Sequence, residues 1–415
     1  MAFIGRKPTN APLTSDDIPN GIIGAADLAT GLSKLTWDTT AKTSGFTAVS
    51  NTGYVCNTTS SAFTVTLPAS PTAGDTIILL DYAGTFATNN ITLGANSNKI
   101  NGATGNKMLT TNREAISLTY IDSTQGWVAS SGTNFGSQSI DPLTYSADFL
   151  VVAGGGGGGP YGGGGAGGYR NSYLTETSGG GGSSESSLTF VPGTVYTITV
   201  GGGGAGSSST ATNGTDSSIS GTGITTITSN GGGGGGTTAQ AGSGGSGGGS
   251  ADSGRGGAVG SGTANQGYAG GLGFSDTTTF TIGGGGGGAS AVGTAATSTV
   301  CGNGGNGLAS SITGSSVSRG GGGGGGGSGG KTAGTGGTGG GGNGHTGSGG
   351  SNGTANTGGG GGAKESPAHF SGGSGVVILR MPTASYSGIT TGSPTVTTDG
   401  SDKVIVFNSS GSITG

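Results

Sequence analysis

Charged side chains are scarce in this chain, and their scarcity excludes several classes of protein. Only 8% of the 415 residues are Asp, Glu, Lys or Arg, and the net charge is −4. Proteins that bind nucleic acids or anionic membranes carry basic patches, which this composition does not supply. We therefore expect neither a nucleic acid nor a membrane as a partner. Disorder driven by charge repulsion is not expected either.

Cysteine and histidine are almost missing as well. Cys56 and Cys301 lie in regions of different composition, so the sequence predicts no disulfide framework. The two histidines, His345 and His369, have no Cys or carboxylate cluster at ligand spacing, so no metal site is predicted. Neither a Ser/His/Asp arrangement nor a pair of carboxylates suited to glycoside cleavage is visible. We expect a protein that is not an enzyme and needs no cofactor.

One segment does match a catalytic pattern. Residues 325–332 (GGGSGGKT) fit the phosphate-binding loop motif, which needs a buried strand before it and a helix after it. The residues that follow, 333–337 (AGTGG), cannot form a stable helix. The two required glycines carry little information in so glycine-rich a chain, and we reject the match.

Long apolar segments are also lacking. The N-terminus becomes polar within eight residues, so neither a signal peptide nor a membrane span is predicted. A surface-exposed composition without a secretion signal is typical of a virion component, which host lysis releases.

Glycine is what the chain has in abundance, with 107 residues. Four uninterrupted runs occupy residues 154–159, 231–236, 283–288 and 320–327, each near a short apolar or β-branched stretch. A flexible linker needs no such anchors. Glycine also lets backbone pack against backbone, so we interpret the runs as extended threefold helices of the polyproline-II type, packed side by side. Collagen is excluded because no Gly-X-Y period persists.

The energetics require these helices to be cooperative. Ordering a backbone costs about 1–2 kcal/mol per residue, most of all for glycine, whereas a net hydrogen bond returns about 1 kcal/mol. A lone run therefore stays disordered, as in a Gly/Ser linker, which is the alternative interpretation. Order requires several runs whose peptide groups bond to one another.

Composition divides the chain into four predicted parts within a mainly β protein. Residues 1–35 form an entry segment with a short helix, 36–136 an antiparallel β-sandwich or jelly roll, 137–382 a strand-framed polyglycine-II lattice, and 383–415 a C-terminal hairpin or small sheet. The strands predicted in the second part are 63–67, 76–80, 90–93, 115–120 and 127–129.

Leu28, Leu32 and Leu35 have helical spacing in the first part. Three copies of this stripe could meet on a threefold axis. Packing of one helical turn on its own domain is equally compatible, and Gly31 weakens the helix.

Isolated aromatic and histidine side chains stand between the glycine runs. Such residues on a rigid scaffold give a large contact area at low entropic cost, which favours binding. The alternative is that some of them, above all Tyr169 and Phe370, cap the edge of the lattice. The binding candidates are Tyr161, Tyr169, Tyr173, Tyr268, Phe274, His345, His369 and Phe370.

The order of three segments resembles the glycine-rich domain of bacteriophage tail fibres. They are residues 148–153 (DFLVVA), 188–202 (LTFVPGTVYTITVGG) and 374–380 (SGVVILR). Residues 3–8 (FIGRKP) and 17–23 (DIPNGII) resemble the virion-proximal start of tail fibres from marine podoviruses, and the block that contains 118–120 and 126–128 resembles a recurrent fibre domain.

This resemblance implies a homotrimeric fibre in the virion, assembled in the host cytoplasm and acting outside the cell. The N-terminus would attach to tail or adaptor proteins, and loops of the C-terminal domain would bind a host surface glycan or outer-membrane protein. Two alternatives stay open. One is a structural fibre or decoration protein without receptor binding, and the other is a bacterial surface or ice-binding protein, against which the missing signal peptide argues.

Overall fold

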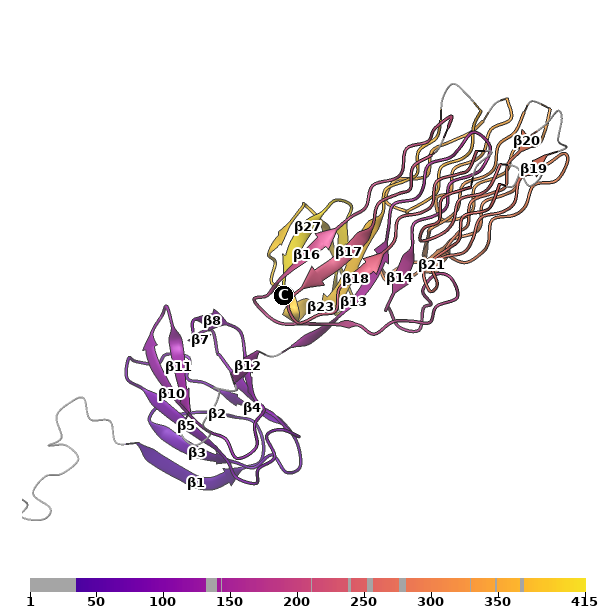
Figure 1. The fold of residues 1–415 in the computed structure, drawn as a ribbon. Helices are drawn as coiled ribbons and strands as arrows, with labels where there is room; N and C mark the ends of the chain where they lie inside the picture. The colour runs from indigo at the N-terminus through magenta and orange to yellow at the C-terminus, as the bar shows by residue number, and fades with distance from the viewer. Residues whose placement is uncertain are drawn as a thin grey trace, which may run out of the picture. The chain divides into compact units, whose positions relative to one another are not determined.

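The computed structural model describes residues 35–131, 140–142, 144–209, 211–237, 240–251, 257–275, 281–328, 330–347, 349–365 and 369–415. The chain divides into two compact units, Met1–Leu143 and Thr144–Gly415 (Figure 1). The predicted mainly β class is confirmed: besides strands, the described residues form one 3-10 turn, η1 (Thr383–Ser385). None of the helical structure in them is long enough to cross a bilayer.

The predicted entry segment falls almost wholly outside the described residues, and Leu28 and Leu32 with it. Leu35 is described and is half-buried just before the first strand.

The first unit contains two sheets. Their strands are β1 (Thr36–Lys42), β2 (Phe46–Thr47), β3 (Thr52–Cys56), β4 (Phe63–Thr66), β5 (Thr76–Asp81), β6 (Ile91–Gly94), β7 (Lys99–Ile100), β8 (Ala103–Thr104), β9 (Lys107–Leu109), β10 (Ala115–Asp122), β11 (Gly126–Ser131) and β12 (Ile140–Pro142). One sheet has the order β1-β3-β5-β10-β11-β7-β8, and the other has the order β12-β9-β6-β4-β2.

The first six strands alternate between these two sheets, and their neighbours within each sheet are parallel. The chain therefore winds three times around one core before β9 to β12 add antiparallel pairs. These parallel pairs differ from the antiparallel β-sandwich or jelly roll that was predicted. Sequence alternation indicates which face of a strand is buried, but it does not specify the direction of the neighbouring strand.

Side chains fill the core of the first unit in the usual way. In β5 the buried residues Ile77, Leu79 and Asp81 alternate with half-buried ones, and Leu118 and Trp127 from β10 and β11 complete the same cluster. Asp81 is buried as a hydrogen-bond acceptor, because its carboxylate receives the backbone N–H groups of Gly84, Phe86 and Arg113.

The second unit begins with a sandwich. Its strands are β13 (Tyr145–Val152), β14 (Tyr169–Asn171), β15 (Leu188–Phe190), β16 (Val195–Thr199), β17 (Ser217–Gly221), β18 (Ile227–Ser229), β23 (Val376–Pro382), β24 (Thr390–Thr391), β25 (Thr395–Asp399), β26 (Asp402–Phe407) and β27 (Gly411–Thr414). One sheet runs β14-β13-β23-β26-β25 with β15 also on β13, and the other runs β18-β17-β16-β27-β24. The C-terminal residues 383–415 thus belong to the sheets of this unit.

β13 and β23 are buried on both faces, which explains their uninterrupted apolar sequence. Phe149 and Val151 face the core between the two sheets, whereas Leu150 and Val152 face a second core that includes Tyr169. Two short hairpins complete the unit: β21 (Leu308–Ser310) with β22 (Val317–Arg319), whose Leu308 packs against this second core, and β19 (Phe274–Ser275) with β20 (Thr281–Ile282).

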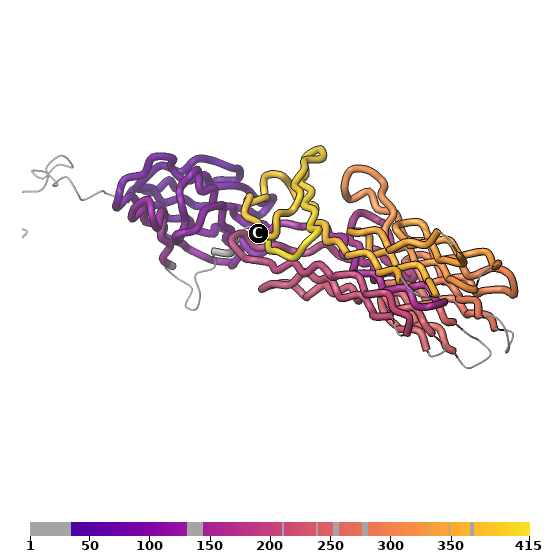
Figure 2. The backbone as a smooth tube through the Cα atoms, turned by 90° about the horizontal axis from the view of Figure 1, so that it is seen from above, coloured from indigo at the N-terminus to yellow at the C-terminus, as the bar shows by residue number. Residues whose placement is uncertain are grey.

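Long extended segments run side by side from this sandwich, and the hairpin β19–β20 lies at their opposite end (Figures 1 and 2). We call the sandwich end proximal and the other end distal. Three of the four glycine runs follow strands of the proximal end directly: 154–159 follows β13, 231–236 follows β18 and 320–327 follows β22. The run 283–288 follows β20 and returns toward the sandwich.

The hydrogen bonds of the run 154–159 repeat every third residue. The N–H groups of Gly154 and Gly157 donate to Thr215 and Thr212, those of Gly155 and Gly158 to Gly373 and Phe370, and those of Gly156 and Gly159 to Gly165 and Gly162. Each acceptor segment is thus engaged at three-residue steps, and each runs antiparallel to the donor.

The carbonyl groups of the same run accept from three further segments, all parallel to it. Their donors are the N–H groups of Gly232 and Gly235, of Gly204 and Ser207, and of Gly361 and Lys364. The run therefore has six neighbours, three that accept from it and three that donate to it. This is the threefold, side-by-side arrangement that the sequence predicts.

Glycine is required here because the segments approach too closely for any side chain. A Cβ atom at Gly286, in the middle of the run 283–288, would lie 2.0 Å from the carbonyl oxygen of Gly164. At the lattice edge, polar side chains replace the missing neighbours. Asn213 and Asp216, three residues apart, accept the N–H groups of Gly234 and Gly231 at 2.9 and 2.8 Å.

Candidate functional site

The register of the glycine runs determines which loops lie at the distal end. The run 154–159 leaves β13, so the turn between Gly159 and Gly162 is distal, and Tyr161 lies in it. The carbonyl of Tyr161 accepts the N–H of Gly326 at 2.7 Å, and Gly327 donates to the carbonyl of His345 at 3.2 Å. Tyr161 and His345 therefore flank the distal end of the same run.

Six side chains form what we call the distal patch: Tyr161, His345, Lys364, Glu365, His369 and Phe370. The Lys364 ammonium lies 5.7 Å from the centre of the Phe370 ring, and Nδ1 of His369 is 3.1 Å from the Lys364 carbonyl oxygen. Gly350 joins His345 to this group, because a Cβ built there would meet both the Phe370 ring and Cβ of His345. Four of the predicted binding residues thus share one surface.

A hydrogen bond between side chains fixes one corner of the distal patch. The Tyr161 hydroxyl donates to Oε1 of Glu365 at 2.9 Å. Partial burial, together with the neighbouring Glu365 carboxylate, raises the pKa of Tyr161 to about 12. The phenol therefore remains a donor at neutral pH, and the half-buried ring stays available for contact.

Phe274 is also distal but is held differently. It lies in β19 and pairs with Ile282 of β20, which in turn forms a bridge with Gly327. The ring is half-buried. Recognition through Phe274 would therefore use the β19–β20 hairpin rather than a lattice turn.

The remaining three candidates lie at the proximal end. Tyr169 is fully buried in the core beside Leu150 and Val152, where burial raises the pKa of its hydroxyl, so its predicted place in a binding loop is wrong. Tyr173 is half-buried under the Arg380 guanidinium, 5.1 Å from its ring centre. Tyr268 donates its backbone N–H to Gly288, at the proximal end of a run.

The sequence analysis did not identify Lys364 and Glu365 as part of a binding surface. The available signal was their position, five residues before His369 and Phe370, at the end of the glycine run 358–362. Because charged residues are so few in this chain, a Lys and a Glu side by side near an aromatic residue indicate a surface with unusual binding chemistry.

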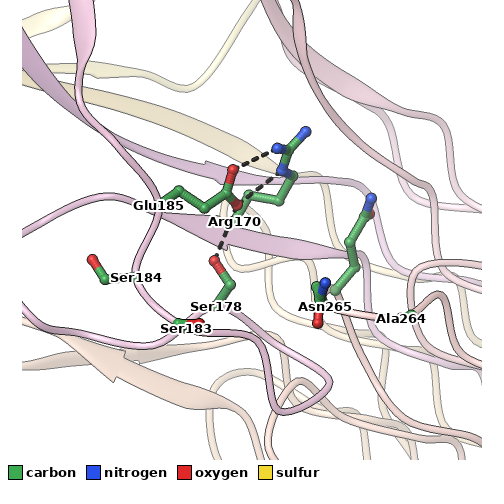
Figure 3. A pocket seen from close by; sticks show the side chains of 8 residues that line it. Arg170, Ser178, Ser183, Ser184, Glu185, Ala264 and Asn265 are labelled. Carbon is green, nitrogen blue, oxygen red and sulfur yellow. Dashed lines mark hydrogen bonds and ion pairs between the residues drawn. The ribbon is translucent and has the colours of Figure 1, made fainter.

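A polar cleft of about 430 Å³ lies near the proximal end (Figure 3). It is lined by Arg170, Ser178, Ser183, Ser184, Glu185, Ala264, Asn265 and Gln266. Arg170 forms a two-pronged ion pair with Glu185, with Nε donating to Oε1 at 2.9 Å, and Ser178 donates to the same oxygen at 3.1 Å. Sequence reasoning did not identify this cleft, because its walls come from segments about 80–95 residues apart.

Within the described residues, no group of three or more His, Cys, Asp or Glu side chains is arranged to hold a metal ion. Cys56 and Cys301 are buried free thiols in different units. Burial raises the pKa of Cys56 to about 12, so this thiol is protonated at neutral pH.

Comparison with known families matches residues 128–382 to a model described as a glycine-rich domain. The match spans the lattice and ends with β23. No curated protein matches the chain.

Proposed function

The chain belongs to the glycine-rich domain family, and from this premise we propose that it is a bacteriophage tail fibre protein that binds the host surface through the distal patch. Two observations support the proposal. The segments at 148–153, 188–202 and 374–380 resemble phage fibres, and they form β13, β15, β16 and β23, which frame the lattice. Such a lattice is a rigid support, because every central run is bonded to six others.

The distal patch is the observation that carries the proposal. It gathers an aromatic ring, a tyrosine hydroxyl, two histidines and one charge of each sign at the end farthest from the sandwich. Aromatic rings stack on sugars and on peptide side chains, while the charged and polar groups give direction to the contact. This chemistry suits a surface glycan or an outer-membrane protein, and the role requires neither catalysis nor a cofactor.

The test is competition for attachment. Purified full-length chain, added in excess to host cells, should reduce adsorption of the phage that carries it. Tyr161→Ala and Lys364→Ala should weaken the inhibition about tenfold or more, as expected for central contacts. Lys403→Ala is the control, because Lys403 lies on β26, where it donates to Thr398.

Unimpaired adsorption at saturating concentrations of folded protein would contradict receptor binding and favour a purely structural fibre. Equal inhibition by all three variants would show that recognition lies elsewhere on the chain.

We also propose a homotrimer that attaches to virion tail or adaptor proteins through residues 1–35. Light scattering on the full chain should give three times the chain mass of 38.5 kDa. Replacing Leu28, Leu32 and Leu35 by Ser should dissociate the trimer if the stripe packs on a threefold axis. A monomeric wild-type chain would contradict this part of the proposal.

A further inference from the structure

The polar cleft at the proximal end has the composition of a binding site, and it is separate from the distal patch. Its volume of about 430 Å³ falls in the range of about 300–1,000 Å³ that small-molecule sites occupy. β14 and the segment 178–185 supply one wall with Arg170 and Glu185, and Asn265 belongs to the turn on the other side (Figure 3).

The ion pair at the cleft is held in place from behind. Arg170 donates through Nε and Nη2 to Glu185 and through Nη1 to the carbonyl of Thr228, at 3.2 Å for the last. Ser178, which is buried, accepts the N–H of Asn171 and donates to Glu185. The side chains of Arg170 and Glu185 are only 24% and 23% exposed. This wall is therefore rigid before any ligand arrives.

Hydrogen-bonding capacity remains on the cleft side. A guanidinium has five N–H donors, of which Arg170 uses three, and the Glu185 carboxylate accepts three bonds out of about four. Within the described part of the chain, no hydrogen bond engages the Asn265 side-chain amide or the Ser183 hydroxyl. The cleft thus offers both donors and acceptors, and the charges of its ion pair cancel.

The two walls meet where the glycines of the segment 178–185 contact the turn that carries Asn265. A Cβ at Gly182 would lie 2.9 Å from Cβ of Asn265, and one at Gly181 would lie 3.2 Å from the Tyr268 hydroxyl. The glycine loop 179–182 therefore lies directly against the turn that carries Asn265, and Tyr268 is adjacent to it. Asn265 itself has a φ of 60°, a left-handed conformation that Asn tolerates better than most residues.

From these features we infer that the cleft binds a neutral saccharide. Sugar hydroxyls both donate and accept, which matches the mixed donors and acceptors, and the compensated ion pair favours neither an anion nor a cation. A second cleft of about 360 Å³ is also lined by Glu185, together with Leu188 and Ile224, and gives a longer saccharide room beyond its first ring. The inference does not depend on receptor binding at the distal patch.

The test is saturation-transfer NMR with the full chain and a panel of neutral pyranosides: the methyl glycosides of glucose, galactose and mannose, N-acetylglucosamine, and their disaccharides. At least one should bind with a dissociation constant of about 1 mM. Asn265→Gly keeps the left-handed backbone but removes the amide, and it should weaken binding about fivefold or more. Asn356→Gly is the matched control, because Asn356 has a φ of 61° and does not line the cleft.

Three results would overturn the inference: no binding by any member of the panel up to about 10 mM, equal affinities in both variants, or stronger binding of galacturonate or glucose 6-phosphate than of the neutral sugars. Inhibition of phage adsorption by the distal patch would be unaffected by any of these outcomes, so the two proposals can fail separately.

Discussion

The first unit and the glycine lattice of the second unit are stabilised in different ways, the first by packed side chains and the second by the backbone. In the first unit, side chains such as Leu79 and Trp127 fill a space between two sheets, and the backbone pairs within each sheet. In the centre of the glycine lattice, backbone packs against backbone, and each central run bonds to six neighbours through its peptide groups. A hydrophobic core tolerates changes of shape better than a lattice whose backbones are in direct contact.

The largest effect should come from a methyl group inside the lattice. In Gly286→Ala the new Cβ would stand 2.0 Å from the Gly164 carbonyl oxygen, so the six-neighbour packing must open. We expect a loss of about 3 kcal/mol or more from the second unit, measured by thermal unfolding of the full chain.

Gly202→Ala is the control, because its Cβ would meet nothing closer than Thr215 at 3.9 Å. It should change stability by no more than about 0.5 kcal/mol. Equal tolerance of the two substitutions would refute close backbone packing.

A truncation in the first unit should follow the rules of an ordinary core. Leu79 is fully buried, and Leu79→Ala should cost about 2–5 kcal/mol through lost burial and the cavity it leaves. Calorimetry should show a lower transition for the first unit and an unchanged one for the second. A shift of both transitions would mean that the units do not unfold separately.

At the lattice edge a side chain stands in for a neighbouring helix, and its loss should have an intermediate effect. Asn213→Ala removes the acceptor of the buried Gly234 N–H and the donor to the Ser243 carbonyl. Leaving a buried N–H unsatisfied costs about 1–3 kcal/mol. Chemical denaturation should detect this loss, and Asn213→Asp, which keeps the acceptor, should recover part of it.

The smallest effect concerns pH. Burial tends to raise the pKa of Glu176, but hydrogen bonds from Ser310, Ser311 and Asn171 outweigh it, so the folded pKa lies below the ordinary value. A depressed pKa stabilises the folded state above the ordinary value of about 4.3 and loses this contribution as pH falls through the folded pKa. In Glu176→Gln, the free energy of unfolding of the second unit should therefore fall less steeply as the pH drops below about 4. The same pH dependence in the variant and the wild type would contradict this prediction.

The glycine lattice could be predicted from the sequence because the pattern that produces it lies within short, contiguous segments. Uninterrupted glycine next to strand-forming residues leaves backbone packing as the one way to order the runs, and the strands at 148–152 and 376–379 are apolar enough to locate. The parallel winding of β1 to β6 was not predictable in the same way, because alternation shows which face is buried and says nothing of the partner strand.

The site could be predicted only in part, for a related reason. Tyr161, His345, His369 and Phe370 come together because the lattice register places their turns at one end, and that register follows from hydrogen bonds between segments up to about 200 residues apart. Tyr169 shares their composition but lies at the other end of its run, next to Leu150, where it is buried. Position along a run, and not residue type, decides whether an aromatic ring is exposed.

Amide hydrogen exchange of the full chain tests the central claim most directly. If each central run is bonded to six neighbours, the N–H groups of Gly155, Gly156 and Gly157 should be protected as strongly as those of β13 and β23. Exchange of these glycine amides at the rate of an unstructured peptide, alongside protected strands, would show that the runs are linkers and would contradict the lattice.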